Sequence, residues 1–178
     1  NWPSTGDYDM NDLVIREQFQ TIYNANNLIS GFKINGYIDA RGASFKNGFA
    51  LRLLNVSASN FKQANLEINS ESYNKTPEQN QTDLVFQLWN NSHTFTTTGE
   101  SGPCQHFNTV KDCTEFSAIP FELDVKFETP ITSLSHSSLD FFIFRKNYRG
   151  REIHFADYPP TDLFDFSQLG RIDDTSDA

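Results

Sequence analysis

Apolar and polar residues alternate along much of the chain, a pattern typical of strands with one face on a core and the other in water. The clearest case is residues 121–128, where four apolar residues alternate with four charged ones. Residues 13–23 alternate in the same way, so Leu13, Ile15, Phe19 and Tyr23 are expected on one face. Further strands are predicted over residues 32–39, 48–54, 83–90 and 139–145, the last buried on both faces because its apolar run is nearly continuous.

Turn-forming pairs such as Asn35-Gly36 and Asn47-Gly48 separate these segments. No segment predicts an amphipathic helix longer than two turns. Residues 70–82 are polar and are expected to form a surface loop, and residues 94–120 a long excursion. Many short strands with frequent turns predict an all-β fold, an antiparallel β-sandwich or jelly roll with long loops and few or no helices.

The length of 178 residues suits one domain, which we expect to span residues 1–178 and to belong to a larger exported protein. A hydrophobic share of 37%, with 17 phenylalanines, supplies a core. The net charge of −9 argues against a nucleic-acid binder, which needs a basic face. No apolar stretch reaches the ~20 residues of a membrane span. We therefore expect a monomeric domain with neither nucleic acid nor membrane insertion.

The two cysteines, Cys104 and Cys113, flank a short polar loop that begins with Gly102-Pro103. This arrangement predicts a disulfide and hence an oxidising compartment, so the chain is expected to be secreted or on the cell surface. A zinc site formed by the two cysteines and His106 is the alternative. It lacks both CxxC spacing and an evident fourth ligand.

Oxygen-bearing side chains crowd the segment Asp7-Tyr8-Asp9-Met10-Asn11-Asp12. Asp7, Asp9, Asn11 and Asp12 occupy spaced positions of one tight loop that opens into a strand, and such oxygens can converge on calcium. The alternative is an acidic turn without a metal. Three acids near the end of the chain are further candidate metal ligands: Asp162, Asp173 and Asp174.

Basic, acidic, imidazole and aromatic groups are dense in Tyr148-Arg149-Gly150-Arg151-Glu152-Ile153-His154 and in the following Tyr158-Pro159-Pro160-Thr161-Asp162. We interpret this run as a loop that holds a polar or anionic ligand, with arginine as a bidentate clamp for a carboxylate. The alternative is a surface loop with internal ion pairs. The candidate ligand-binding residues are Tyr148, Arg149, Arg151, Glu152, His154 and Tyr158.

Templates for catalysis are absent from the sequence. There is no GxSxG elbow and no HExxH, and the four histidines show no paired metal spacing. We therefore expect no enzyme and no catalytic residue. A hydrolase with paired acids is the alternative, because the separation of carboxylates is invisible in sequence.

Three segments together carry a family resemblance. Trp2-Pro3-Ser4-Thr5-Gly6-Asp7-Tyr8-Asp9-Met10-Asn11-Asp12-Leu13-Val14, the central Ala43–Phe49 and the C-terminal run described above resemble LruC-type domains of exported bacterial proteins. Within that group the chain is similar to the peptide-binding domain of large calcium-dependent RTX adhesins. The resemblance implies calcium binding and adhesion through a ligand on another cell, and it assigns no catalytic residue.

The leading hypothesis is therefore a calcium-dependent adhesin module that binds a short peptide, by way of its C-terminal carboxylate, on other cells or in a biofilm. A carbohydrate-binding module is the second hypothesis. Its natural platforms are Trp2 and Trp89, although the place of Trp89 in a predicted strand favours the core. A structural spacer stiffened by calcium is the third.

Overall fold

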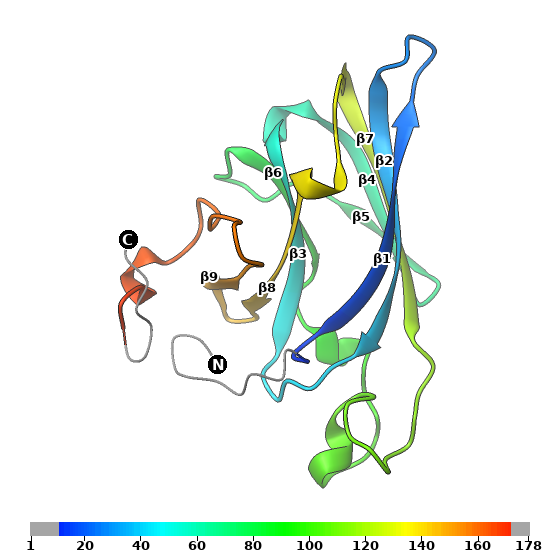
Figure 1. Cartoon of the computed structure of the whole chain (residues 1–178), viewed down its shortest axis with the longest axis vertical. Coiled ribbons are helices and arrows are strands. Elements are labelled where there is room, and N and C mark those ends of the chain that lie inside the picture. Colours follow the sequence, from blue (N-terminus) through cyan, green and yellow to red (C-terminus); the bar gives the residue numbers. More distant parts are fainter. Residues whose placement is uncertain (1–10, 172–178) are drawn as a thin grey trace.

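The computed structural model describes residues 11–171, which form two antiparallel β-sheets packed face to face (Figure 1). The first sheet has the strand order β1 (Val14–Tyr23), β2 (Ile29–Ala40), β7 (Ile119–Ile131), β4 (Phe61–Ile68) and β5 (Glu71–Lys75). The second has the order β6 (Asp83–Trp89), β3 (Asn47–Ser57), β8 (Leu139–Arg145) and β9 (Tyr148–Ile153). Helical structure within these residues is limited to short 3-10 turns. The predicted all-β sandwich is confirmed.

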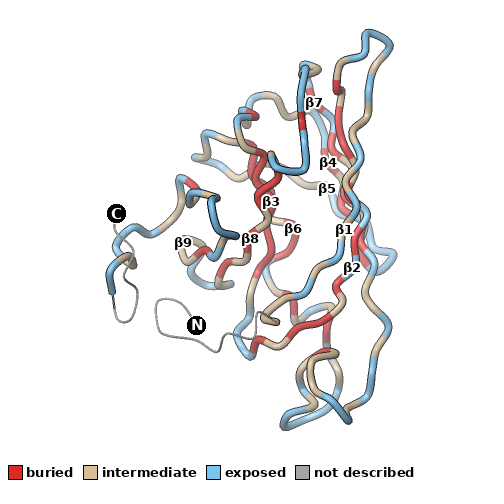
Figure 2. The backbone as a smooth tube through the Cα atoms, viewed as in Figure 1, coloured by how far each residue is buried: buried red, intermediate tan, exposed pale blue. Residues whose placement is uncertain are grey.

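The core lies between the two sheets, where the buried positions of facing strands meet (Figure 2). In β7 the buried and less buried residues alternate as the sequence predicts. Aromatic rings connect the layers: Phe61 of β4 meets Phe86 of β6 at 5.7 Å, and Phe121 of β7 meets Trp89 of β6 at 5.5 Å. Trp89 is 6% exposed, so its predicted place in the core is confirmed.

One strand prediction fails at its end. Tyr23 was expected on the core face of its strand, yet it is 55% exposed. The pairing of β1 with β2 is irregular here, because Ile22 pairs with Gly31 and Tyr23 with Ile29, so regular alternation ends with the last residue of β1.

Residues 70–82 are not wholly a loop, because they contain β5. All side chains of β5 except that of Lys75 are exposed, so the strand has no apolar alternation to reveal it. Backbone pairing with β4, from Ala64↔Lys75 to Ile68↔Glu71, holds it at the edge of the first sheet. The run expected to be a ligand loop likewise contains β9, which pairs with β8.

The predicted excursion before β7 contains the disulfide between Cys104 and Cys113, with an S–S distance of 2.04 Å. The excursion is tied to the sandwich where Arg41 and Phe107 pair through their backbones. Phe107 is fully buried, and the guanidinium of Arg41 donates to the carbonyl oxygens of Ala43, Thr96 and Gln105. In the described part of the chain, no helix is long and apolar enough to span a membrane.

Reduction of the disulfide should destabilise the domain. Closing a loop between cysteines nine positions apart removes conformational freedom from the unfolded chain, which corresponds to about 2–3 kcal/mol. Calorimetry with and without a reductant should show Tm lower by roughly 5–10 °C in the reduced protein. The double variant Cys104→Ser/Cys113→Ser should melt at the lower temperature and ignore the reductant. Equal melting of the oxidised and reduced wild type would contradict this expectation.

Candidate ligand-binding site

Charged side chains are buried on the outer face of the second sheet, opposite the apolar core. Arg52 is 4% exposed, Asp140 0% and Glu152 4%. They lie beside a small apolar cluster on the same face, formed by Ala50, Val85, Phe142 and Phe144. Residues 154–161, which follow β9 and which we call the covering segment, cover them. In Figure 1 that segment is orange and lies beside β3 and β8, on the side facing away from the first sheet. Buried charges of this kind need partners within the protein.

Arg52 and Asp140 are direct cross-strand neighbours on β3 and β8, and their side chains form an ion pair of 2.7 Å. The guanidinium of Arg52 also donates to the carbonyl oxygens of Pro159 and Pro160, so it clamps the covering segment. His154 approaches Asp140 from the other side, with 2.9 Å between Nδ1 and Oδ2. Its ring stacks on Phe142 at a centroid distance of 4.4 Å.

His154 bridges two carboxylates. Its Nε2 lies 2.8 Å from Oε2 of Glu152, while Nδ1 faces Asp140. Both ring nitrogens must donate in this geometry, which requires the charged imidazolium. Burial alone would lower the pKa of His154, but the hydrogen bonds to Asp140 and Glu152 outweigh it and raise the pKa above 6.5.

Glu152 is held in its ionised form by donors on both oxygens. Burial alone would raise its pKa, but hydrogen bonds from His154 and Thr161 and the charge of Arg149 lower the pKa to about 2. Thr161 contributes its hydroxyl at 2.6 Å and its backbone N–H at 2.9 Å. Since Thr161 lies in the covering segment, these bonds fix that segment against β9.

Arg149 connects this network to the loop before β6. It donates to both carboxylate oxygens of Glu78, from Nε at 2.7 Å and from a terminal nitrogen at 2.5 Å, and it also pairs with Glu152. Its guanidinium packs against the rings of Phe142 and Phe144 at 5.0 and 5.1 Å. Burial alone would lower the pKa of Arg149, but the bonds to Glu78 raise it.

The network is electrically balanced, with three cations facing three anions. Of the predicted ligand-binding residues, Arg149, Glu152 and His154 belong to it, and they already have partners within the chain. Their remaining partners are Arg52, Asp140 and Glu78, which the sequence reasoning missed. The available signal was charge inside apolar strands: Arg52 interrupts the run Ala-Leu-Arg-Leu-Leu, and Asp140 precedes Phe141-Phe142-Ile143-Phe144.

Tyr148 and Arg151, also predicted, lie on the surface next to this network. The guanidinium of Arg151 is 5.1 Å from the ring centre of Tyr148 and donates to Oε1 of Gln168 at 3.1 Å. Arg145 packs against the same tyrosine ring at 5.3 Å and against Phe45 at 5.1 Å. Among residues 11–171 neither arginine has a carboxylate within ion-pair distance. We call Phe45, Arg145, Tyr148 and Arg151 the Tyr148 surface.

Tyr158 does not join the Tyr148 surface. Its hydroxyl donates to the carbonyl oxygen of Ser137, directly before β8, whereas Tyr148 pairs with Arg145 at the other end of that strand. The two tyrosines therefore lie at opposite ends of β8.

The predicted metal ligands are only partly described. Asp7, Asp9, Asp173 and Asp174 lie outside the described residues. Asn11 accepts a hydrogen bond from the backbone of Gly42 before β3. Asp162 accepts one from the backbone of Thr82 at 2.5 Å, near the far end of β3. Because β3 extends over 11 residues, roughly 3.3 Å each, Asp162 lies apart from Asn11.

Within residues 11–171, a close group of metal-ligating side chains is found at Glu100, Cys104 and Cys113. Both cysteines are oxidised in the disulfide, so neither thiolate is available to an ion. The zinc alternative is therefore excluded in this state of the protein.

Comparison with known families assigns the chain to one of them. The family model described as a domain of unknown function, DUF4842, matches residues 27–178, and the chain belongs to this family. The match includes all nine strands except the first, together with the charge network. No curated protein and no solved structure matches the chain.

The buried imidazolium makes a prediction about pH. Because the folded pKa of His154 is raised, its stabilising contribution is complete below the unfolded value near 6.5 and is lost as the pH rises through the folded pKa. His154→Gln should lower the free energy of unfolding by roughly 1.5–3 kcal/mol at pH 6, and the difference should shrink at alkaline pH. An NMR titration of the ring protons checks the same point, and a pKa at or below 6.5 would contradict it.

Proposed function

We propose that this member of the DUF4842 family is a non-catalytic, calcium-dependent binding domain of the LruC type, serving a secreted or cell-surface adhesin. Its ligand is a short peptide whose C-terminal carboxylate binds at the Tyr148 surface. The observation that carries the proposal is the pair of guanidinium groups, those of Arg145 and Arg151, that flank one exposed tyrosine ring without a carboxylate partner in the described chain.

A carboxylate suits this surface for reasons of geometry and field. A guanidinium presents parallel N–H donors that match the two oxygens of a carboxylate. Two exposed lysines, Lys46 and Lys146, are brought side by side by a backbone hydrogen bond and add positive charge beside Arg145. On a chain with net charge −9, such a basic surface steers anionic groups toward one place.

The aromatic rings of the surface supply the contact area that a peptide needs. Tyr148 is 56% exposed and Phe45 47%. Exposed aromatic rings beside arginines are typical of binding hot spots. A tyrosine ring buries much surface at a small entropic cost, because it has only two side-chain torsions. The side chain next to the peptide terminus would pack on these rings while its carboxylate meets Arg151.

The pairing and the ionisation of the buried carboxylates favour a binding domain over a hydrolase. Asp140, Glu152 and Glu78 are each engaged by cations and hydrogen bonds. The pKa of Glu152 is lowered to about 2, which is the reverse of what a general acid requires. The paired carboxylates therefore support a structural role.

Calcium enters the proposal through the acidic loop of residues 7–12. Its side chains offer the oxygen donors that calcium prefers, and bound calcium would neutralise their mutual repulsion at the entry to β1. The end of this loop is anchored at Asn11, whose backbone carbonyl accepts a hydrogen bond from the backbone of Gly42 at 2.8 Å. Asn11 packs so closely that a Cβ added to Gly42 would lie 1.8 Å from its Oδ1. Only glycine leaves room for Asn11 at this position. Asp162, Asp173 and Asp174 are proposed as ligands of the C-terminal end.

The disulfide is consistent with an oxidising compartment outside the cytoplasm. We therefore propose that the peptide belongs to a protein on another cell or in a biofilm. The domain would act as a monomer within a longer chain, with no nucleic-acid partner.

Capture of a carboxylate is testable with paired peptides. A library of short peptides with free C-termini, screened by calorimetry in calcium, should contain binders whose C-terminal amides bind at least roughly tenfold more weakly. Arg151→Met should weaken the free-acid peptide by a similar factor. Arg16→Met is the matched control, because Arg16 also stacks on a tyrosine, Tyr37 at 4.5 Å, but is paired with Asp39. Equal affinity of acid and amide would contradict the proposal.

Calcium dependence is tested separately by thermal unfolding. Wild-type protein should melt several degrees higher in millimolar calcium than in EDTA, because an ion that binds the folded state stabilises it. Asp9→Asn should reduce that rise, whereas Glu115→Gln, an exposed acid in the excursion before β7, should leave it unchanged. Identical melting of the wild type in calcium and EDTA would contradict the calcium site.

A further inference from the structure

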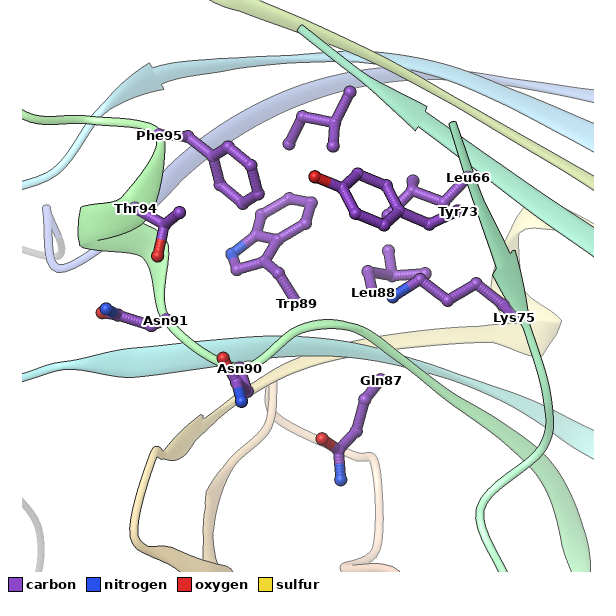
Figure 3. A pocket seen from close by; sticks show the side chains of 11 residues that line it. Leu66, Tyr73, Lys75, Gln87, Leu88, Trp89, Asn90, Asn91, Thr94 and Phe95 are labelled. Atoms are coloured by element: carbon purple, nitrogen blue, oxygen red, sulfur yellow. The ribbon is translucent and has the colours of Figure 1, made fainter. Parts of the chain in front are cut away.

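A pocket of about 310 Å³ opens between the edge strands of the two sheets, far from the Tyr148 surface in the strand order. Tyr73 and Lys75 reach into it from β5, and Trp89 and Leu88 face them from β6 (Figure 3). Its volume is near the lower end of the ~300–1,000 Å³ of small-molecule sites. The lining residues on the other sides are Leu66, Ile68, Gln87, Asn90, Asn91, Thr94 and Phe95.

The floor of the pocket is rigid and aromatic. The indole N–H of Trp89 donates to the hydroxyl of Ser92 at 3.0 Å, which fixes the ring. Phe95 meets Trp89 edge to face at 5.9 Å. At the rim the ring of Tyr73 is 37% exposed, and its hydroxyl donates to the carboxylate of Glu71. Tyr73 therefore offers its ring face, rather than its hydroxyl, to an occupant.

Lys75 brings a cation into this aromatic pocket without an anion to balance it. Among the described residues no carboxylate lies within ion-pair distance of its Nζ, which instead lies over the Tyr73 ring at 5.7 Å. Two other lysines of the same sheet are paired, Lys33 with Glu122 at 2.8 Å and Lys62 with Glu128 at 3.9 Å, and Lys126, which has no such pair among the described residues, is exposed to water. Burial lowers the pKa of Lys75, as expected for an ammonium that has lost water without gaining a partner.

Short polar side chains complete one wall, where Figure 3 shows Asn90, Asn91 and Thr94 beside the aromatic floor. Asn91 uses its side-chain oxygen to accept from the backbone of His93, which leaves its amide N–H groups for an occupant. Amides and hydroxyls that both donate and accept suit a ligand rich in hydroxyl groups. A ring face beside them suits the C–H face of a sugar.

We propose that this pocket binds a sugar residue that carries a carboxylate, such as a uronic acid unit of an acidic polysaccharide. The carboxylate pairs with Lys75, the hydroxyls meet Asn91 and Thr94, and the sugar ring packs on Tyr73. A charge-assisted hydrogen bond to a partly desolvated ammonium is stronger than one at the surface, so the carboxylate determines selectivity. The pocket is independent of the peptide site, because the two lie at opposite edges of the second sheet, at β6 and at β9.

The test uses short oligomers of glucuronate, galacturonate and mannuronate, with their methyl esters as neutral controls. Calorimetry should show binding of at least one uronate, with its methyl ester at least tenfold weaker. Lys75→Met should weaken that uronate at least tenfold and should not lower Tm, because it removes an unpaired charge from a partly buried site. Tyr73→Ala should weaken acid and ester alike, because it removes the stacking ring.

Two matched variants show whether uronate binding is specific to this pocket. Lys62→Met, at an exposed lysine of neighbouring β4, should leave uronate affinity unchanged. Arg151→Met should also leave it unchanged, which distinguishes failure here from failure of the peptide site. No binding of any uronate at millimolar concentration, equal binding of acid and ester, or full affinity in Lys75→Met would each overturn the proposal.

Discussion

The imidazolium of His154, held between Asp140 and Glu152, is the interaction on which the outer half of this molecule depends. Removing charges from water is costly, and the cost is offset only when each charge has a partner and its remaining hydrogen bonds are made. Here three cations and three anions pair with one another, although Nε of Arg52 is buried without a hydrogen-bond partner among the described residues. The arrangement links β3, β8, β9, the loop before β6 and the covering segment.

The buried charge network also separates the arginines of this face into two groups. Arg52 and Arg149 belong to the network. Arg52 donates to the carbonyl oxygens of Pro159 and Pro160, and Arg149 pairs with Glu78. Arg145 is the last residue of β8 and Arg151 lies on β9; both are partly exposed and pack against the ring of Tyr148. A dense run of charges thus serves two purposes, cohesion on one side and recognition on the other. The second sheet accordingly has a proposed site at each edge, one beside β9 and one beside β6.

Most strands that touch the core were predicted from the sequence, but β4 was missed although its Ala64, Leu66 and Ile68 are buried there. The exposed edge strand β5 was missed as well. β7 shows its alternation because one face meets the apolar layer, whereas β5 shows none because four of its five side chains are exposed. Edge strands are held by backbone hydrogen bonds, and the sequence does not record these. The exposed Tyr23 shows a second limit, since the irregular pairing of β1 with β2 at this residue leaves no sign in the sequence pattern.

Half of the residues in the charge network were predicted from the sequence: Arg149, Glu152 and His154. The run from Tyr148 to Asp162 is chemically dense. The interpretation as internal ion pairs holds for Arg149, Glu152 and His154, whereas ligand binding by Arg151 stays a proposal. The sequence does not reveal the partners Arg52 and Asp140, because cross-strand neighbours 88 positions apart are set by register. The pocket at Lys75 was hidden for the same reason, since it exists only where the edges of two sheets meet.

NMR of the arginine Nε–H groups tests most directly whether Arg52 and Arg149 face inward while Arg145 and Arg151 face outward. Signals of Arg52 and Arg149 should exchange slowly with water and stay in place when a bound free-acid peptide is added. Signals of Arg145 and Arg151 should exchange rapidly in the free protein and should shift on addition of the peptide. Shifts confined to Arg52 and Arg149, with Arg145 and Arg151 unmoved, would contradict the account.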